Sequence, residues 1–219
     1  MKTSHILVIF LVATSMFLVG SADAQIVDFC GSNATVVLNG APGPVVALAA
    51  CPAGDAPPPA VFGWWIEITV VSNSVPIQNI PAEDFWLFDC DGGSNLFLCG
   101  GQQSINADST TNAAGQTTIS EVALAAGGCV TGMSVVVQGV VLPDPANCGV
   151  ALCLPIEMKS FDMTADGAVT PADLSTFAGQ YPPNPGHACS NFTGVGPVTT
   201  LADLSTFAIH FGPPGHLCL

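Results

Sequence analysis

The chain has 219 residues, of which 16 are acidic and only two are basic, so its formal net charge is −14 at pH 7. This balance excludes partners that are recognised through phosphate groups, such as nucleic acids and anionic membrane surfaces. The chain is nevertheless apolar overall, with a mean hydropathy of +0.56. We therefore expect apolar burial, disulfides and a bound cation, rather than salt bridges, to hold the fold.

Residues 1–24 have the features of a secretion signal. Lys2 supplies a positive start, an apolar stretch follows, and an A-x-A cleavage sequence ends at Ala24. Nothing later in the chain resembles a transmembrane helix. We expect a mature chain that begins near Gln25, is exported, is not an integral membrane protein, and keeps Lys159 as its one fixed cation.

The segment 25–155 contains short stretches rich in Val, Ile, Thr and aromatic residues, separated by clusters of Gly, Pro, Asn and Asp. No segment in it has helical periodicity. Repeated strands at this spacing favour a mainly β fold, an antiparallel β-sandwich. The predicted strands are Ala34–Leu38, Val45–Ala50, Trp64–Ser72, Asp84–Phe88, Thr117–Leu124 and Met133–Leu142.

The stretch from Asp108 to Ile119, DSTTNAAGQTTI, is a turn followed by a strand. It resembles a signature of bacterial Ig-like surface domains. The resemblance implies an Ig-like antiparallel β-sandwich over 25–155, and we place the boundary to the next module at Leu154–Lys159.

Two neighbouring tryptophans begin one predicted strand. Ile66 and Ile68 alternate with polar Glu67 along it, as on a half-buried antiparallel strand. Trp64 and Trp65 must then point to opposite faces. Unless loops or the C-terminal module cover both, one of them is exposed as a stacking platform of the kind that binds sugar rings.

Nine cysteines indicate disulfides formed in an oxidising compartment. Short spacings suggest the pairs Cys30–Cys51, Cys90–Cys99 and Cys148–Cys153, with Cys189–Cys218 closing the C-terminal module and Cys129 left over. A zinc site made by His187, Cys189, His216 and Cys218 is a weaker alternative, because exported cysteines are usually oxidised.

The densest acidic group comprises Glu83, Asp84, Asp89 and Asp91. Paired carboxylates can perform glycoside chemistry across a cleft, and a second calcium loop is another alternative. We favour solvated turn residues, since the last two flank Cys90 beside two glycines. No nucleophile elbow or phosphate loop is present either, so we predict that the protein is not an enzyme.

A twelve-residue calcium loop is predicted from Asp162 to Asp173. Oxygen-bearing side chains fall at loop positions 1, 3, 5, 9 and 12, position 7 offers a backbone carbonyl, and a glycine at position 6 allows the sharp bend. Calcium requires six to eight oxygens, and one short loop can supply them only when the ligand positions alternate in this way. The predicted ligands are Asp162, Thr164, Asp166, Ala168, Thr170 and Asp173.

Two amphipathic helices follow this loop as a repeat. Thr170 to Asp173 and Thr200 to Asp203 each form a capping box, and the string DLSTFA is identical at 173–178 and 203–208. Apolar residues recur at helical spacing, so we expect the two faces to bury each other. The two stripes are Leu174, Phe177, Ala178, Tyr181 and Leu204, Phe207, Ala208, Phe211.

The second copy lacks the metal ligands. In a gapless alignment Phe192, Gly194 and Gly196 replace the first three ligands, so we expect one calcium site. An Asp at loop position 12, followed by Leu and a short apolar helix, resembles the dockerin calcium loop, and dockerins are tandem repeats of this kind. The resemblance covers residues 156–219.

Dockerins bind cohesin domains and so attach their cargo to a scaffold or cell surface, often in polysaccharide degradation. The resemblance therefore implies a secreted, non-catalytic protein that docks through a calcium module. The partner contacts are less well preserved, because Pro171-Ala172 and Leu201-Ala202 stand where dockerins often have Ser-Thr. A structural surface-layer protein, in which calcium only stabilises the fold, and a carbohydrate-binding module are the alternatives.

Overall fold

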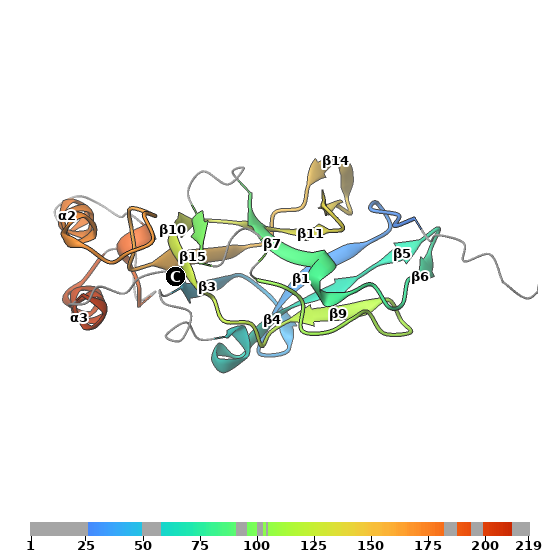
Figure 1. Cartoon of the computed structure of the whole chain (residues 1–219), viewed down its shortest axis with the longest axis horizontal. Coiled ribbons are helices and arrows are strands. Elements are labelled where there is room, and N and C mark those ends of the chain that lie inside the picture. Colours follow the sequence, from blue (N-terminus) through green and yellow to red (C-terminus); the bar gives the residue numbers. More distant parts are fainter. Residues whose placement is uncertain are drawn as a thin grey trace, which may run out of the picture.

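The structure is a computed structural model, and it describes residues 26–49, 58–90, 96–99, 103, 105–181, 188–193 and 199–211. The predicted signal lies outside the described residues. Over this part the chain is mainly β, with several antiparallel sheets and two α-helices (Figure 1). Neither of the described helices is long and apolar enough to span a bilayer.

One four-stranded antiparallel sheet shows the predicted alternation. Trp64, Ile66 and Ile68 are at most 1% exposed and face the core, whereas Trp65 is half-buried and Glu67 exposed on the outer face. The two tryptophans therefore separate as predicted. In order, the strands are β2 (Ala41–Pro42), β1 (Asn33–Leu38), β4 (Trp64–Thr69) and β9 (Gln116–Ile119).

The other strands form two larger sheets and two ribbons, joined in part by short 3₁₀ turns. The second four-stranded sheet has the order β3 (Val45–Ala49), β15 (Ile156–Ser160), β10 (Ala126–Val130), β8 (Leu96–Leu98). The three-stranded sheet has the order β12 (Val140–Val141), β11 (Met133–Val137), β7 (Phe85–Asp89). The ribbons are β13 (Pro143–Asp144) with β14 (Asn147–Ala151) and β5 (Val71–Ser72) with β6 (Val75–Pro76). The 3₁₀ turns are η2 (Pro59–Phe62), η3 (Ala82–Asp84) and η4 (Ala188–Ser190).

The three larger sheets share one apolar core. Ile66 of the first sheet, Met158 of the second, and Leu87 and Val135 of the third are all fully buried in it. Burying each such side chain contributes about 1.5–3 kcal/mol. Apolar packing is therefore the main source of stability here, while an Ig-like arrangement of these sheets stays a prediction.

One strand pair departs from the antiparallel prediction. β15 runs parallel to β3, with Ile156 opposite Val45 and Ser160 opposite Ala49. Parallel neighbours require a crossover connection, and the long chain segment between these two strands supplies it. β15 begins at residue 156, where the sequence-based division starts the C-terminal module, so this module shares a strand with the sheet.

Strand boundaries differ from the prediction where turns intervene. The strand predicted to reach Leu124 ends at Ile119. The one predicted over 133–142 is a hairpin, because Gln138 and Gly139 adopt positive φ values of 50° and 84°, the geometry of a two-residue turn. The missed strands longer than two residues are β8, β10, β14 and β15, which are rich in Gly, Cys, Leu or charged residues rather than in β-branched ones.

The predicted local disulfides are wrong. The described bonds are Cys30–Cys148, Cys90–Cys153 and Cys129–Cys189, and Cys99 is disulfide-bonded as well. Strand pairing explains the difference: Met133 of β11 lies opposite both Asp89 and Leu154, which brings the adjacent Cys90 and Cys153 together. Cys129, predicted to be left over, is paired with Cys189, and Cys51 and Cys218 lie outside the described residues.

The helices α2 (Pro171–Gln180) and α3 (Leu201–His210) lie together at one end of the molecule (Figure 1). Their faces bury each other only in part: Phe177 and Phe207 are 1% exposed with ring centroids 5.3 Å apart. Leu174, Ala178 and Ala208 of the predicted stripes are exposed. Phe192 explains this, because its ring lies 6.0 Å from Phe177 and 6.3 Å from Phe207. An aromatic core, comprising Phe161, Phe177, Phe192 and Phe207, thus joins the helices to the sheet.

Candidate metal centre

The predicted calcium loop connects the sheet to the first helix. β15 ends at Ser160, the loop begins at Asp162, and Thr170 caps α2, whose first residue is Pro171. Proline fits this position because the N–H group that it lacks would have no intrahelical partner in the first turn. Gly167 has a φ of 88°, in the left-handed region that its lack of a side chain allows. The sharp bend predicted at loop position 6 is therefore present.

The loop brings the three predicted carboxylates together. Asp162, Asp166 and Asp173 each offer a carboxylate oxygen within 4.8 Å of the others. Asp162 and Asp173 are fully buried, whereas Asp166 is exposed. Among the described residues, this is the one group of three or more His, Cys, Asp or Glu side chains that could hold a metal ion.

The electrostatics of Asp162 favour a cation beside it. Its carboxylate accepts bonds from the backbone N–H groups of Gly167 (2.8 Å) and Asp166 (3.2 Å), which oppose protonation. Burial nevertheless raises the pKa of Asp162 above its ordinary value, and the nearby charges of Asp173 and Asp166 raise it further. A bound cation would relieve both the desolvation and the repulsion.

Asp173 links the loop to the helix cap. Its Oδ1 accepts from the N–H and the hydroxyl of Thr164, both at 2.9 Å. Its Oδ2 accepts from the N–H of Thr170 at 2.6 Å and from the hydroxyl at 3.1 Å. The predicted capping box is confirmed. These bonds occupy the acceptor sites of the carboxylate, which number about four, so a metal bound at Asp173 would have to replace at least one of the two hydroxyl donors.

The remaining predicted ligands lie around the carboxylates. The hydroxyl of Thr164 is 3.5 Å from Oδ1 of Asp162, and Ala168 donates its backbone N–H to Asp166 over 3.1 Å. Hydroxyl and carboxylate oxygens are the donor types that calcium prefers. The residues present therefore fit a hard cation, while ligation by the Thr170 hydroxyl and the Ala168 carbonyl stays a prediction.

Two glycines that the sequence analysis did not single out hold this loop against β10. Gly128 donates its N–H to the Asp162 carbonyl at 2.6 Å. A Cβ added at Gly127 would collide with Oδ2 of Asp162. The Gly-Gly pair within the stretch AAGGC was the available signal, because glycine inside a strand often marks a close backbone approach.

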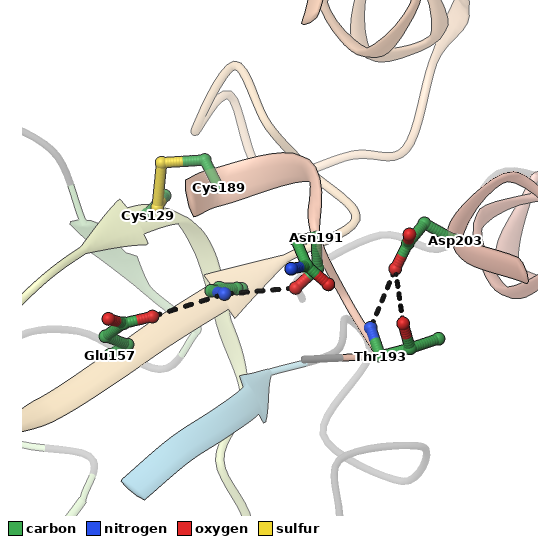
Figure 2. A network of polar contacts seen from close by, with 7 residues as sticks. Cys129, Glu157, Cys189, Asn191, Thr193 and Asp203 are labelled. Carbon is green, nitrogen blue, oxygen red and sulfur yellow. Dashed lines mark hydrogen bonds and ion pairs between the residues drawn. A yellow bond between two sulfur atoms is a disulfide. The ribbon is translucent and has the colours of Figure 1, made fainter. Parts of the chain in front are cut away.

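The second half-repeat (191–211) repeats the cap of the first (162–181) without carboxylates in the places of Asp162 and Asp166. Asp203 accepts from the N–H and hydroxyl of Thr193 at 2.8 and 2.9 Å (Figure 2). It also accepts from the N–H and hydroxyl of Thr200, at 2.7 and 2.8 Å. Burial acts to raise the pKa of Asp203, but these four bonds outweigh it and the pKa is lowered.

This bonding corrects the gapless alignment. Thr193, ten residues before Asp203, occupies the place of Thr164, which is nine residues before Asp173. Asn191 then corresponds to Asp162, and Phe192 corresponds to Met163. Phe192 therefore belongs to the aromatic core rather than to a lost ligand position.

The second half-repeat is fixed to the sheet by other means. Cys189 is disulfide-bonded to Cys129 of β10 (Figure 2). The buried ammonium of Lys159 donates to the backbone carbonyl of Asn191 at 3.0 Å and lies 3.2 Å from the carboxylate of Glu157. Because Cys189 is oxidised, it is not available as a zinc thiolate. The other three members of the zinc hypothesis lie outside the described residues.

Among the described residues, the acidic group in the N-terminal part does not form a second cluster of possible metal ligands. Asp89 is buried at 3% exposure, whereas Glu83 is exposed on η3. Asp91 lies outside the described residues. Comparison of the chain with protein-family models, with curated proteins and with solved structures finds no match.

Proposed function

We propose that this is a non-catalytic exported protein that binds one calcium ion through residues 162–173 and docks through its helix pair onto a partner protein, such as a cohesin-like domain of a scaffold or cell surface. The observation that carries the proposal is the convergence of Asp162, Asp166 and Asp173 within 4.8 Å at the start of α2. Three disulfides among the described residues are consistent with an extracellular protein.

An open apolar groove between the helices supports docking. It has a volume of about 260 Å³, and one of its lining side chains, Leu201 of α3, is 70% exposed. Apolar patches of this kind, when exposed, commonly mark protein–protein contacts. The groove is lined by Leu174, Phe177, Ala178, Tyr181, Leu201 and Leu204.

A second candidate function is favoured by how tightly the module is attached. The Cys129–Cys189 bond, the Lys159 hydrogen bond and the shared strand β15 make the half-repeats one unit with the sheets. In a structural surface protein, calcium would then only stabilise the fold. Copies of the chain, rather than a cohesin-like domain, would cover the groove.

The metal proposal is tested by calorimetric calcium titration of the full mature chain, 25–219. We expect one site and a rise in melting temperature, both lost in the variant Asp162→Asn, Asp166→Ala. The control Glu83→Gln, Glu121→Gln removes the same number of charges from exposed positions and should behave like the native chain. No heat and no stabilisation up to millimolar calcium would refute the proposal, since even weak extracellular sites bind at about 10⁻⁴–10⁻³ M.

The two candidate functions differ in what covers the groove. Docking predicts calcium-dependent capture by immobilised cohesin domains, lost in the variant Leu174→Ser, Leu201→Ser, together with a monomeric chain in sedimentation. The structural role predicts no capture and a calcium-dependent self-association that the same variant abolishes.

A further inference from the structure

A polar groove lies on the outer face of the first sheet, away from the calcium loop. It has a volume of about 280 Å³ and is formed between β4, β9 and the turn that precedes β9. Its lining is hydroxyl, amide and carboxylate groups in the main. The polar members are Glu67, Thr69, Ser109, Asn112, Gln116, Thr117 and Thr118.

Trp65 lies two residues before Glu67 on β4, and Glu67 lines the groove. Its side chain is half-buried on the same face as Glu67, and its indole nitrogen donates to Oε1 of Glu67 at 3.0 Å. This bond joins the ring to a side chain that lines the groove. An aromatic ring held at the edge of a polar groove offers an apolar face next to hydrogen-bonding groups.

The turn before β9 is held in place by its own polar contacts. Asp108 accepts from the hydroxyl of Thr118 at 2.7 Å and from the N–H of Glu121 at 2.8 Å. Oδ1 of Asn112 accepts from two backbone N–H groups of the turn, at 2.8 and 3.1 Å, so its Nδ2 points away from the turn backbone. The groove is therefore formed before any ligand binds, which lowers the entropic cost of binding.

The chemistry of the groove selects its ligand. Among the described residues lining it there is no cation, and the chain's net charge of −14 repels polyanions. The lining offers little apolar surface for a lipid or an apolar peptide. Hydroxyls, amides and one carboxylate beside an indole suit the alternating hydroxyl and C–H faces of a sugar.

We propose that this groove binds a short segment of a neutral glycan, with one ring stacked on Trp65 and its neighbour hydrogen-bonded to Glu67, Asn112 and Gln116. The volume lies just below the range of about 300–1,000 Å³ typical of drug-sized ligands. This size suits one or two sugar units of a longer chain. The inference is independent of the calcium proposal, because no residue is shared.

The test is affinity electrophoresis of the full mature chain in gels that contain xylan, mannan, β-glucan or starch, with dextran sulfate as the anionic comparison. We expect retardation by at least one neutral polysaccharide and none by dextran sulfate. Trp65→Ala should weaken binding at least tenfold, and Gln116→Ala, at an exposed position, should weaken it severalfold without a change in melting temperature.

Two controls separate this site from the rest of the molecule. Trp86→Phe alters a half-buried tryptophan on β7 of another sheet and should leave binding unchanged. The variant Asp162→Asn, Asp166→Ala should still bind glycan although it loses calcium. Absence of retardation by every neutral polysaccharide, retardation that Trp65→Ala leaves unaltered, or equal retardation by dextran sulfate would each overturn the proposal.

Discussion

The two half-repeats share a helix and a cap but order their loops in different ways. Asp173 and Asp203 each accept four hydrogen bonds from two threonines. The first loop adds two further carboxylates, which repel one another without a cation. The second has Asn191 at the corresponding place and is tied down by a disulfide and by Lys159. A capping aspartate at the end of such a loop is therefore no evidence of a metal, and it is the added pair of acids that makes the first loop a candidate metal site.

Removing the disulfide should have the largest effect on the second half-repeat. Cys129 and Cys189 are 60 residues apart, and closing a loop of that length stabilises a fold by about 4 kcal/mol in the chain-entropy description. We expect Cys129→Ser, Cys189→Ser to lose about that much in urea unfolding. A variant is used rather than a reductant, which would open the other disulfides.

The same variant also tests the independence of the two loops. Calcium should raise its stability by the same increment as in the native chain, because the metal is assigned to the first half-repeat alone. Loss of this increment would show that the disulfide supports the metal loop, and the two loops would then not be independent.

Replacing the capping aspartates should separate their two roles. Asp203→Ala leaves four donors in and around a buried cap without their acceptor, at a cost of about 3 kcal/mol, whether or not calcium is present. Asp173→Ala should cost a similar amount in a chelator but more in calcium, since a metal ligand is lost as well. Equal costs for the two variants under both conditions would argue against a metal at Asp173.

The elements that could be predicted from the sequence are those with local causes. The capping boxes of Thr170 and Thr200, the opposite facing of Trp64 and Trp65, and the bend at Gly167 follow from neighbouring residues. The disulfides, the parallel β3–β15 pair and the contact of Gly127 with Asp162 join segments far apart in the chain. The Gly-Gly pair signals a close approach, but no local pattern names the partner of any of these contacts. A gapless alignment could not detect that Thr193 is offset by one residue from Thr164, because only the hydrogen bonds of Thr193 to Asp203 show this.

Gly127→Ala should disturb the first loop selectively. The added Cβ would collide with the Asp162 carboxylate, and overpacking of this kind costs about 1–3 kcal/mol. We expect a stability loss near 2 kcal/mol and a weaker calcium response in thermal unfolding. Gly179→Ala is the matched control: a Cβ there meets nothing within 4 Å, and alanine in a helix should stabilise the chain by about 0.5–1 kcal/mol. A normal calcium response in Gly127→Ala would contradict the position assigned to Asp162.

The smallest effect we predict is a contribution of Asp203 to acid sensitivity in a chelator. Because its pKa is lowered in the fold, its charged form stabilises the chain above the ordinary Asp pKa of about 3.9, and this contribution is lost as the pH falls towards the lowered value. Asp203→Asn should flatten that part of a melting-temperature profile taken between about pH 6 and 2.5. Asp108, whose pKa is lowered by bonds from Glu121, Ser120 and Thr118 despite partial burial, should contribute with the same sign. The pKa of Asp162 is raised by burial, so without metal the contribution of this group to stability changes with pH in the opposite direction. Acid therefore weakens the second half-repeat, whereas protonation of Asp162 relieves the repulsion between carboxylates in the first. An Asp203→Asn profile parallel to that of the native chain would show that the second cap does not depend on its charge.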